Sequence, residues 1–252
     1  MDTTQRMIKQ GNWLFRYRSW LPLILIVFAI FSMIINPYRQ AFTNIWYLLF
    51  CIAVAAAGQI IRIISVGYAA DGTSGRNTKR QVADEINQTG IYSILRNPLY
   101  LGNLLMWLGA ALYTRIWWLV LAFFIIFWLY YERIILAEED YLLDKFGAGY
   151  IAYTEKVNCM VPSLNNYQPN RYTFRIKKAL RQEYSGIYAL FLVFTALELL
   201  RNFLMLHKIY LSAMWIAAGC VLTLSYLTMR LLKKRTHYLD KELECKKLNY
   251  EE

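Results

Sequence analysis

The chain carries the sequence Gly-Ile-Tyr-Ser-Ile-Leu-Arg-Asn-Pro-Leu-Tyr-Leu-Gly at residues 90–102, and no charged residue follows it until Arg115. Pro98 suits the first turn of a helix, because the N–H that proline lacks would have no partner there. The uncharged run after it approaches the ~20 residues that cross a bilayer. Charge beside lipid is costly, so a polar motif containing Arg96 this close to an apolar run indicates a functional site.

Similar apolar runs lie on both sides of this stretch. The uncharged ones are residues 19–38, 40–61, 116–131 and 209–229, and residues 184–203 form a further run that carries Glu198 and Arg201 near its end. We therefore expect an all-α fold, a polytopic membrane helix bundle of about six transmembrane helices. Residues 113–115 leave room only for a short turn, which predicts an antiparallel hairpin between the two runs that they join.

Basic residues favour alternate connections between these runs. Four precede the first run, four lie within residues 76–96 and eight within residues 133–181, whereas Arg39 and Arg115 stand alone in their connections. By the positive-inside rule, both termini and both motif-bearing connections face the cytoplasm, although residues 201–208 place basic groups on the outer side. Contact of the inner connections with anionic headgroups explains the net charge of +11, so no nucleic-acid partner is expected.

A second polar motif follows the predicted hairpin. It begins at Glu138-Glu139 and continues through Leu142, Phe146-Gly147, Tyr150, Tyr153, Val157 and Pro162. Its apolar and charged residues separate onto two faces, as in an amphipathic helix. Such a helix suits a position flat against the membrane or folded back over a site.

In order and spacing, the two motifs resemble those of the isoprenylcysteine carboxyl methyltransferases and phospholipid methyltransferases, a family of integral membrane enzymes. Residues 96–102 are similar to the family signature Arg-His-Pro-x-Tyr-x-Gly, with Gly90 and Tyr92 at the family's distance before it. The likeness covers roughly residues 50–165. It implies S-adenosylmethionine as the cofactor, in a cytoplasmic pocket closed by the C-terminal segment.

The resemblance also implies which residues hold the cofactor. They are Tyr92, Asn97, Pro98, Leu99, Tyr100 and Glu138, joined by Ile86 and Asn87 just upstream and by the more distant Asn77. The carboxylate of Glu138 would offset the cofactor's positive charge, and aromatic rings would flank the adenine or the sulfonium. Taken singly, these residues could instead be a solvated Glu pair and tyrosines that anchor the interface.

Two positions depart from the family pattern. Asn97 replaces the family's usual His and cannot be protonated. Arg133 is the candidate for the family's substrate-facing, catalytic Arg, but it lies one residue from the expected place, which turns a helical side chain by about 100°. Neither His207 nor His237 lies in a motif, and no metal site is expected.

The implied reaction is direct transfer of a methyl group to an oxygen nucleophile, a carboxylate or phosphate, of a membrane lipid or lipidated substrate. Such a nucleophile is ionised at pH 7 and needs no general base, whereas an amine would arrive protonated. A phospholipid amine N-methyltransferase and a non-enzymatic membrane protein such as a small transporter remain alternatives. The oligomeric state stays open.

Three parts organise the chain. We expect residues 1–43 to form an interfacial segment and the first transmembrane helix, and the resemblance implies that residues 44–165 form the methyltransferase core with both motifs. Residues 166–252 hold a basic linker, two further transmembrane helices and a charged tail. The sequence assigns no role to this last pair of helices.

Overall fold

The computed structural model describes residues 3–18, 21–36, 44–73 and 81–235. Its regular elements within these ranges are α-helices, which confirms the predicted fold class. In chain order they are α1 (Thr3–Tyr17), α2 (Leu21–Ile35), α3 (Ile45–Tyr68), α4 (Ile91–Ile94), α5 (Pro98–Tyr113), α6 (Trp117–Phe146), α7 (Ala148–Lys156), α8 (Ile176–Leu206) and α9 (Ala213–Arg235).

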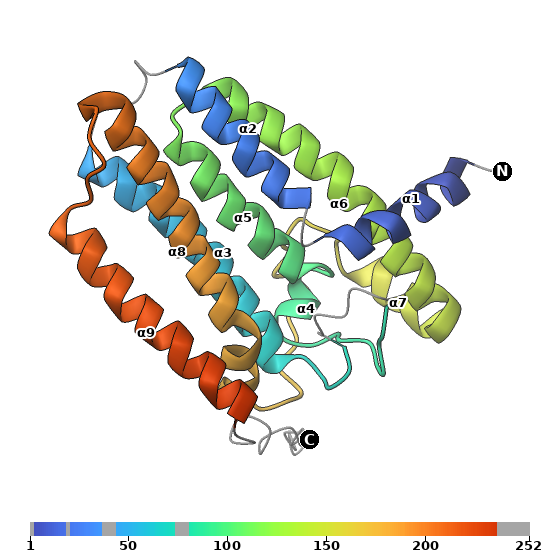
Figure 1. Cartoon of the computed structure of the whole chain (residues 1–252). Helices are drawn as coiled ribbons and strands as arrows, with labels where there is room; N and C mark the ends of the chain where they lie inside the picture. The colour runs from blue at the N-terminus through green and yellow to red at the C-terminus, as the bar shows by residue number, and fades with distance from the viewer. Residues whose placement is uncertain (1–2, 19–20, 37–43, 74–80, 236–252) are drawn as a thin grey trace.

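Long apolar helices build the bundle. Among the described residues, α3, α6, α8 and α9 are long and apolar enough to cross a membrane. The shorter apolar helices α2 and α5, of 15 and 16 residues, run alongside them (Figure 1). These six helices confirm the predicted polytopic bundle, and the short helices α1, α4 and α7 gather at one end of it (Figure 1).

The bounds of two helices differ from those that the uncharged runs predict. Helix α6 continues past residue 131 to Phe146, so the fourth predicted span and the start of the second motif form one helix. Helix α8 begins at Ile176, before the predicted start at residue 184. Glu183 interrupts the uncharged run in the sequence, but the bundle buries this side chain inside the helix.

Helices α3 and α5 approach closely because glycines line their contact. A Cβ atom at Gly58 would clash with the carbonyl oxygen of Gly102, and one at Gly109 would lie 2.5 Å from the carbonyl oxygen of Cys51. Small residues allow this approach between membrane helices. Gly102 ends the first motif, and a Cβ atom there would also lie 2.5 Å from Cγ of Arg62. The motif glycine therefore makes room for the Arg62 side chain.

The turn between α5 and α6 confirms the predicted hairpin. Thr114 caps the end of α5 by donating its hydroxyl hydrogen to the carbonyl oxygen of Ala111 at 2.7 Å. Arg115 reverses the chain with a φ of 58°. Helix α6 follows after Ile116, which is buried.

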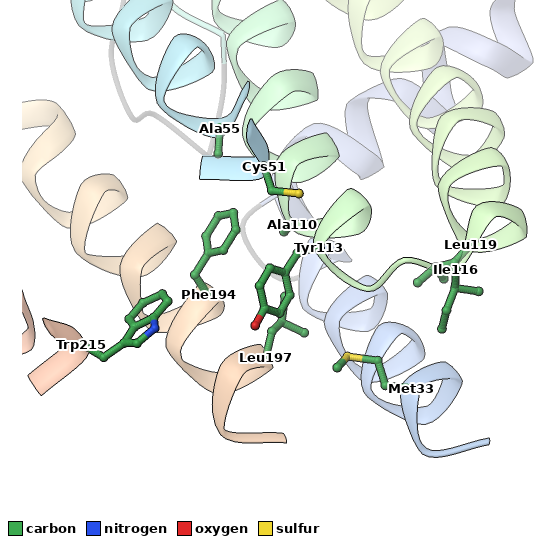
Figure 2. Close-up of a cluster of buried hydrophobic side chains, with 10 residues drawn as sticks. All are labelled: Met33, Cys51, Ala55, Ala110, Tyr113, Ile116, Leu119, Phe194, Leu197 and Trp215. Atoms are coloured by element: carbon green, nitrogen blue, oxygen red, sulfur yellow. The ribbon is translucent and has the colours of Figure 1, made fainter. Parts of the chain in front are cut away.

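The two C-terminal helices pack onto this hairpin. Phe194 and Leu197 of α8 lie in one buried cluster with Tyr113 of α5 and Met33 of α2, and Trp215 of α9 reaches the same cluster (Figure 2). Nearer the other end of α8, the ring of Tyr188 stacks on the ring of Tyr226 in α9, with centroids 4.5 Å apart. Helix α9 is therefore attached to the core mainly through α8.

Candidate functional site

Arg96 of the first motif joins it to the second motif. Its Nη1 donates to the carbonyl oxygens of Thr154 and Val157 at 3.0 and 3.1 Å, at the end of α7. Its Nη2 lies 2.8 Å from Oε1 of Glu139. Burial lowers the pKa of Arg96, but Glu139, Cys159 and Tyr150 together outweigh it, and the net shift is upward. The guanidinium thus stays charged and ties the end of α7 to the start of α5.

Further bonds draw the segment after α7 along the first motif. The hydroxyl of Tyr153 donates to the carbonyl oxygen of Tyr92 at 2.7 Å. The backbone N–H of Arg96 donates to the carbonyl oxygen of Asn158 at 2.9 Å, and that of Ser163 to the carbonyl oxygen of Ile94 at 3.0 Å. The second motif therefore folds back onto the first, one of the two arrangements that its amphipathic pattern allows.

The two motifs meet in a cluster of buried phenols around Glu138. Helix α5 contributes Tyr100, whose hydroxyl is a hydrogen-bond partner of the Glu138 carboxylate. Just after α1, Arg18 places Nη1 3.8 Å from Oε1 of Glu138. Burial raises the pKa of Tyr92 in α4, Arg62 lowers it and Glu138 raises it, so both charged groups act on this phenol. We call Tyr92, Tyr100 and Glu138 the motif cluster.

A chain of polar contacts continues from the motif cluster into the bundle. The rings of Tyr100 and Tyr131 lie 4.7 Å apart. Asn103 donates from Nδ2 to the Tyr131 hydroxyl at 2.9 Å and accepts a hydrogen bond from Nη1 of Arg62 at 2.7 Å. Beyond Arg62 lies Glu183, which is bonded to both Nε and Nη2 of the guanidinium.

Sequence reasoning did not place these inner residues in the site. Arg62 carried a usable signal, because an ionisable side chain next to an apolar run defaults to a functional role. Glu183 carried a weaker one, since it stood at the edge of a run instead of inside it. Nothing in the sequence predicted the contact of Arg18 with Glu138. In the sequence, Arg18 belongs to a basic segment that is typical of the headgroup region.

The predicted residues at the start of α5 face the segment that follows α7. Asn97 donates from Nδ2 to the carbonyl oxygen of Cys159 at 3.2 Å and lies 3.4 Å from its Sγ. Burial raises the pKa of the Cys159 thiol, and the charge of Glu139 raises it further. Pro98 occupies the first turn and is fully buried, and Leu99 is half-buried. The amide of Asn97 thus reaches the closing segment.

Ile86 and Asn87 line a different hollow, a cavity of about 290 Å³ whose wall also includes Phe146 and Arg171. The side chain of Asn87 has two protein partners there. Its Nδ2 donates to the Thr73 hydroxyl at 2.8 Å, and its Oδ1 accepts from the backbone N–H of Ala70 at 2.9 Å. Asn87 therefore fastens the connection after α3, and its predicted cofactor contact stays a prediction.

One further predicted residue, Arg133, lies apart from the motif cluster. Arg133 donates from Nε to Oε1 of Gln10 in α1 at 3.1 Å and from Nη1 to the carbonyl oxygen of Leu129 at 2.7 Å. Its guanidinium thus packs against α1, as the one-residue offset along a helix allows. Asn77 lies outside the described residues. The roles of both residues stay predictions.

Known methyltransferases are similar to the part of the chain that contains these motifs. The family model described as phospholipid methyltransferase matches residues 45–149. The protein-S-isoprenylcysteine O-methyltransferase of Saccharomyces cerevisiae is 31% identical over 121 residues, which cover 48% of this chain and 50% of that protein. Isoform B of the Arabidopsis thaliana enzyme of the same name is 28% identical over 126 residues, 48% of this chain and 61% of that protein.

The corresponding protein of Schizosaccharomyces pombe is 29% identical over 106 residues, 42% of this chain and 45% of that protein. The match thus spans about half the length of these curated relatives. No solved structure matches the chain significantly. The resemblance that the two motifs predict is nevertheless confirmed: residues 45–149 of this chain match the phospholipid methyltransferase family model.

Proposed function

We propose that the protein is an integral membrane methyltransferase, which transfers a methyl group from S-adenosylmethionine to an oxygen nucleophile of a lipid or lipidated substrate. One observation carries the proposal: Tyr92, Tyr100 and Glu138, taken from two separate motifs, converge in one cluster, in which both phenols are buried and Glu138 is half-buried. The O-methyltransferase names of the relatives support the same class of reaction.

The groups in and beside the motif cluster fit the proposed cofactor. Glu138 offers a carboxylate to its cationic groups, and the rings of Tyr92 and Tyr100 offer aromatic faces to the sulfonium or the adenine. Arg62 and Asn103 offer N–H donors to a carboxylate. When bound, S-adenosylmethionine supplies an electrophilic methyl group. The residues of the cluster would orient it and exclude water, so that approximation provides most of the acceleration.

The protonation of the phenols is compatible with an oxygen nucleophile. Burial raises the pKa of Tyr92 and likewise of Tyr150 and Tyr153, so these hydroxyls are protonated at pH 7 and cannot accept a proton. An ionised carboxylate or phosphate needs no acceptor, whereas a protonated amine does. The phospholipid amine class remains the second candidate, because the matching family model carries its name.

We also propose that the motif cluster faces the cytoplasm and that the acceptor enters sideways from the lipid. The charge bias between alternate connections supports this orientation. Helices α1, α4 and α7 lie at the same end of the bundle as the end of α9, whose last turn carries Lys233, Lys234 and Arg235 (Figure 1). The basic last turn of α9 and the helices that carry the motifs therefore share one side.

Calorimetric titration of detergent-purified protein with S-adenosylmethionine tests the cofactor. The parent should bind, and Glu138→Gln should weaken binding by about 1.5–3 kcal/mol, because it removes a charge-assisted partner. Asp140→Asn is the matched control, an exposed acid two residues further along the same helix, and should bind like the parent. Absence of binding by the parent would overturn the proposal.

The acceptor class is tested with S-adenosylmethionine labelled in its methyl group. Prenylated cysteine, a lipid phosphate and phosphatidylethanolamine are offered separately in detergent. Label that mild alkali releases as methanol identifies a carboxyl ester, and label in a phosphate ester identifies the lipid phosphate. Label that stays on nitrogen would replace the oxygen nucleophile with the amine class.

A further inference from the structure

We infer that Glu183 of α8 is a positioning residue for the motif cluster, on which it acts through Arg62. Helix α8 lies beyond residues 45–149, the part of the chain that matches the family. The inference rests on the proposed function and deepens it. It gives the C-terminal helix pair a role in the reaction. Helix α8 would supply Glu183, and α9, which is attached to the core mainly through α8, would support that helix.

The first step is the way in which Glu183 is held. Its side chain is 2% exposed, yet both carboxylate oxygens accept hydrogen bonds. Oε1 accepts from Nη2 of Arg62 at 2.7 Å, and Oε2 accepts from Nε of Arg62 and from Nε2 of Gln59, both at 2.9 Å. Such a two-point pair fixes the plane of the guanidinium, which a single contact would leave free to turn.

The second step is the position of Arg62 between Glu183 and the motif cluster. Its stem crosses α5 at Gly102, where a side chain would clash with it. Its Nη1 bonds Asn103, and Asn103 bonds the Tyr131 hydroxyl, whose ring lies 4.7 Å from the ring of Tyr100. The first motif therefore ends on the residue that lets the Arg62 side chain pass toward the cluster.

The third step concerns the donors of Arg62. A guanidinium has five N–H groups in a fixed plane. Arg62 donates three hydrogen bonds to described residues, two to Glu183 and one to Asn103. Its further N–H groups can donate to an oxyanion. That oxyanion is the carboxylate of the cofactor or the ionised oxygen of the acceptor. Glu183 sets the plane in which these donors are presented, since it holds two of the three bonds.

Helix α8 also contains a matched control. Glu198 is 7% exposed and lies 2.5 Å from Nη2 of Arg201, one turn further along the same helix. It lies in contact with Tyr113 and with no residue of the motif cluster among those described. Glu198→Gln thus removes a buried, paired carboxylate from α8 without touching Arg62.

The experiment titrates full-length protein in detergent with S-adenosylmethionine and follows thermal unfolding in parallel. The variants are Glu183→Gln, Arg62→Gln, the double variant and Glu198→Gln. Glu183→Gln should weaken binding by about tenfold, and the double variant should bind no worse than Arg62→Gln alone, because residues acting through one group are not additive. Glu198→Gln should unfold at a lower temperature but keep the parent's affinity.

Arg62→Lys keeps the charge without the planar fork, so it should lose affinity as Glu183→Gln does. An unchanged cofactor affinity with a tenfold higher KM for the acceptor in both variants would identify the acceptor as the oxyanion. If Glu183→Gln kept the parent's cofactor affinity and the parent's KM for the acceptor, the inference about Glu183 would be overturned and the proposed function would stand. Additive losses of affinity in the double variant would have the same consequence. A parent that does not bind the cofactor would overturn the proposed function and the inference together.

Discussion

Two buried acids of α8 show how similar local chemistry can serve different ends of one molecule. Glu183 and Glu198 are both nearly inaccessible, and each is paired with an arginine. The partner of Glu183 comes from α3, whereas the partner of Glu198 lies one turn along the same helix. Burial and pairing are therefore the same for the two acids and do not show which of them contacts the candidate site.

The difference lies in what each pair contacts next. From Arg62 the contacts continue through Asn103 and Tyr131 to Tyr100 of the first motif. From Glu198 they lead to Tyr113, which belongs to the apolar cluster of Figure 2 beside the turn between α5 and α6. The two acids therefore differ in where their polar contacts lead and not in their burial.

The largest expected effect concerns the two ends of α8. Cysteines are placed at the exposed residues Asn165, before the helix, and Lys208, after it, in a chain whose own cysteines are replaced by serine. By the positive-inside rule, an impermeant thiol reagent should label Lys208→Cys in intact cells and leave Asn165→Cys unlabelled until the cells are opened. The reverse result would place the Glu183 end outside and contradict a cytoplasmic cofactor site.

The next effect compares the two arginines. Arg62→Met removes both hydrogen bonds that the guanidinium donates to the buried Glu183 carboxylate, so the free energy of unfolding should fall by about 3–5 kcal/mol. Arg201→Met should reduce it by about 1–3 kcal/mol, because Tyr113 and Asn202 still donate to Glu198. Denaturant titrations in detergent micelles measure both losses. Equal losses would mean that the two pairs are energetically equivalent.

A smaller effect is expected at Asn97, which lies in the first motif, just before α5. Asn97→Leu removes the bond to the carbonyl oxygen of Cys159 and should weaken cofactor binding by roughly 1–3 kcal/mol. Asn97→His keeps a donor, the one that is commoner in the family, and should bind at least as well as the parent. Its imidazolium donates more strongly than the neutral ring, so its affinity should rise as the pH falls through about 6.5.

Calorimetric titrations between pH 5.5 and 8, a range of roughly one unit on either side of a histidine pKa, measure this effect. The parent should show no such titration, because an amide does not ionise. A parent whose affinity already changes near pH 6.5 would show that a group other than Asn97 governs the pH dependence.

The smallest effect is expected for Arg18, a cation that faces Glu138 at 3.8 Å. Like charges repel, so Arg18→Gln should tighten binding of the cationic cofactor, by less than about 1 kcal/mol because both side chains are partly exposed. Arg16→Gln at the end of α1 is the control and should leave the affinity unchanged. Weaker binding by Arg18→Gln would instead mean that Arg18 helps to hold the cofactor.

Much of the fold could be predicted because lipid excludes charge. The uncharged runs locate the apolar helices, and the three residues 113–115 predict the hairpin that α5 and α6 form. The predicted start of α8 was too late because Glu183 is charged, and the sequence does not show that Arg62 of α3 pairs with it inside the bundle. Likewise, nothing in the run 116–131 marks α6 as continuing to Phe146.

The site could be predicted in part for a related reason. Tyr92, Tyr100 and Glu138 lie within motifs, and the structure brings these three together. Arg62, Asn103 and Glu183 join them through side-chain contacts between distant helices, which depend on helix rotation and not on local pattern. The rotation of α6 also directs Arg133 toward Gln10, and its predicted catalytic role awaits a test.

The close passage of Arg62 over Gly102 has an evolutionary consequence. Two positions 40 residues apart share one small volume, so neither can change freely while its partner stays the same. A lineage that acquires alanine at position 102 should carry a shorter side chain at position 62 and also a wider separation of α3 and α5, because the added Cβ would lie 2.8 Å from the carbonyl oxygen of Gly58. The acid at position 183 should then lose its selective advantage. Substitutions at the three positions should therefore appear together on the branches of a family tree.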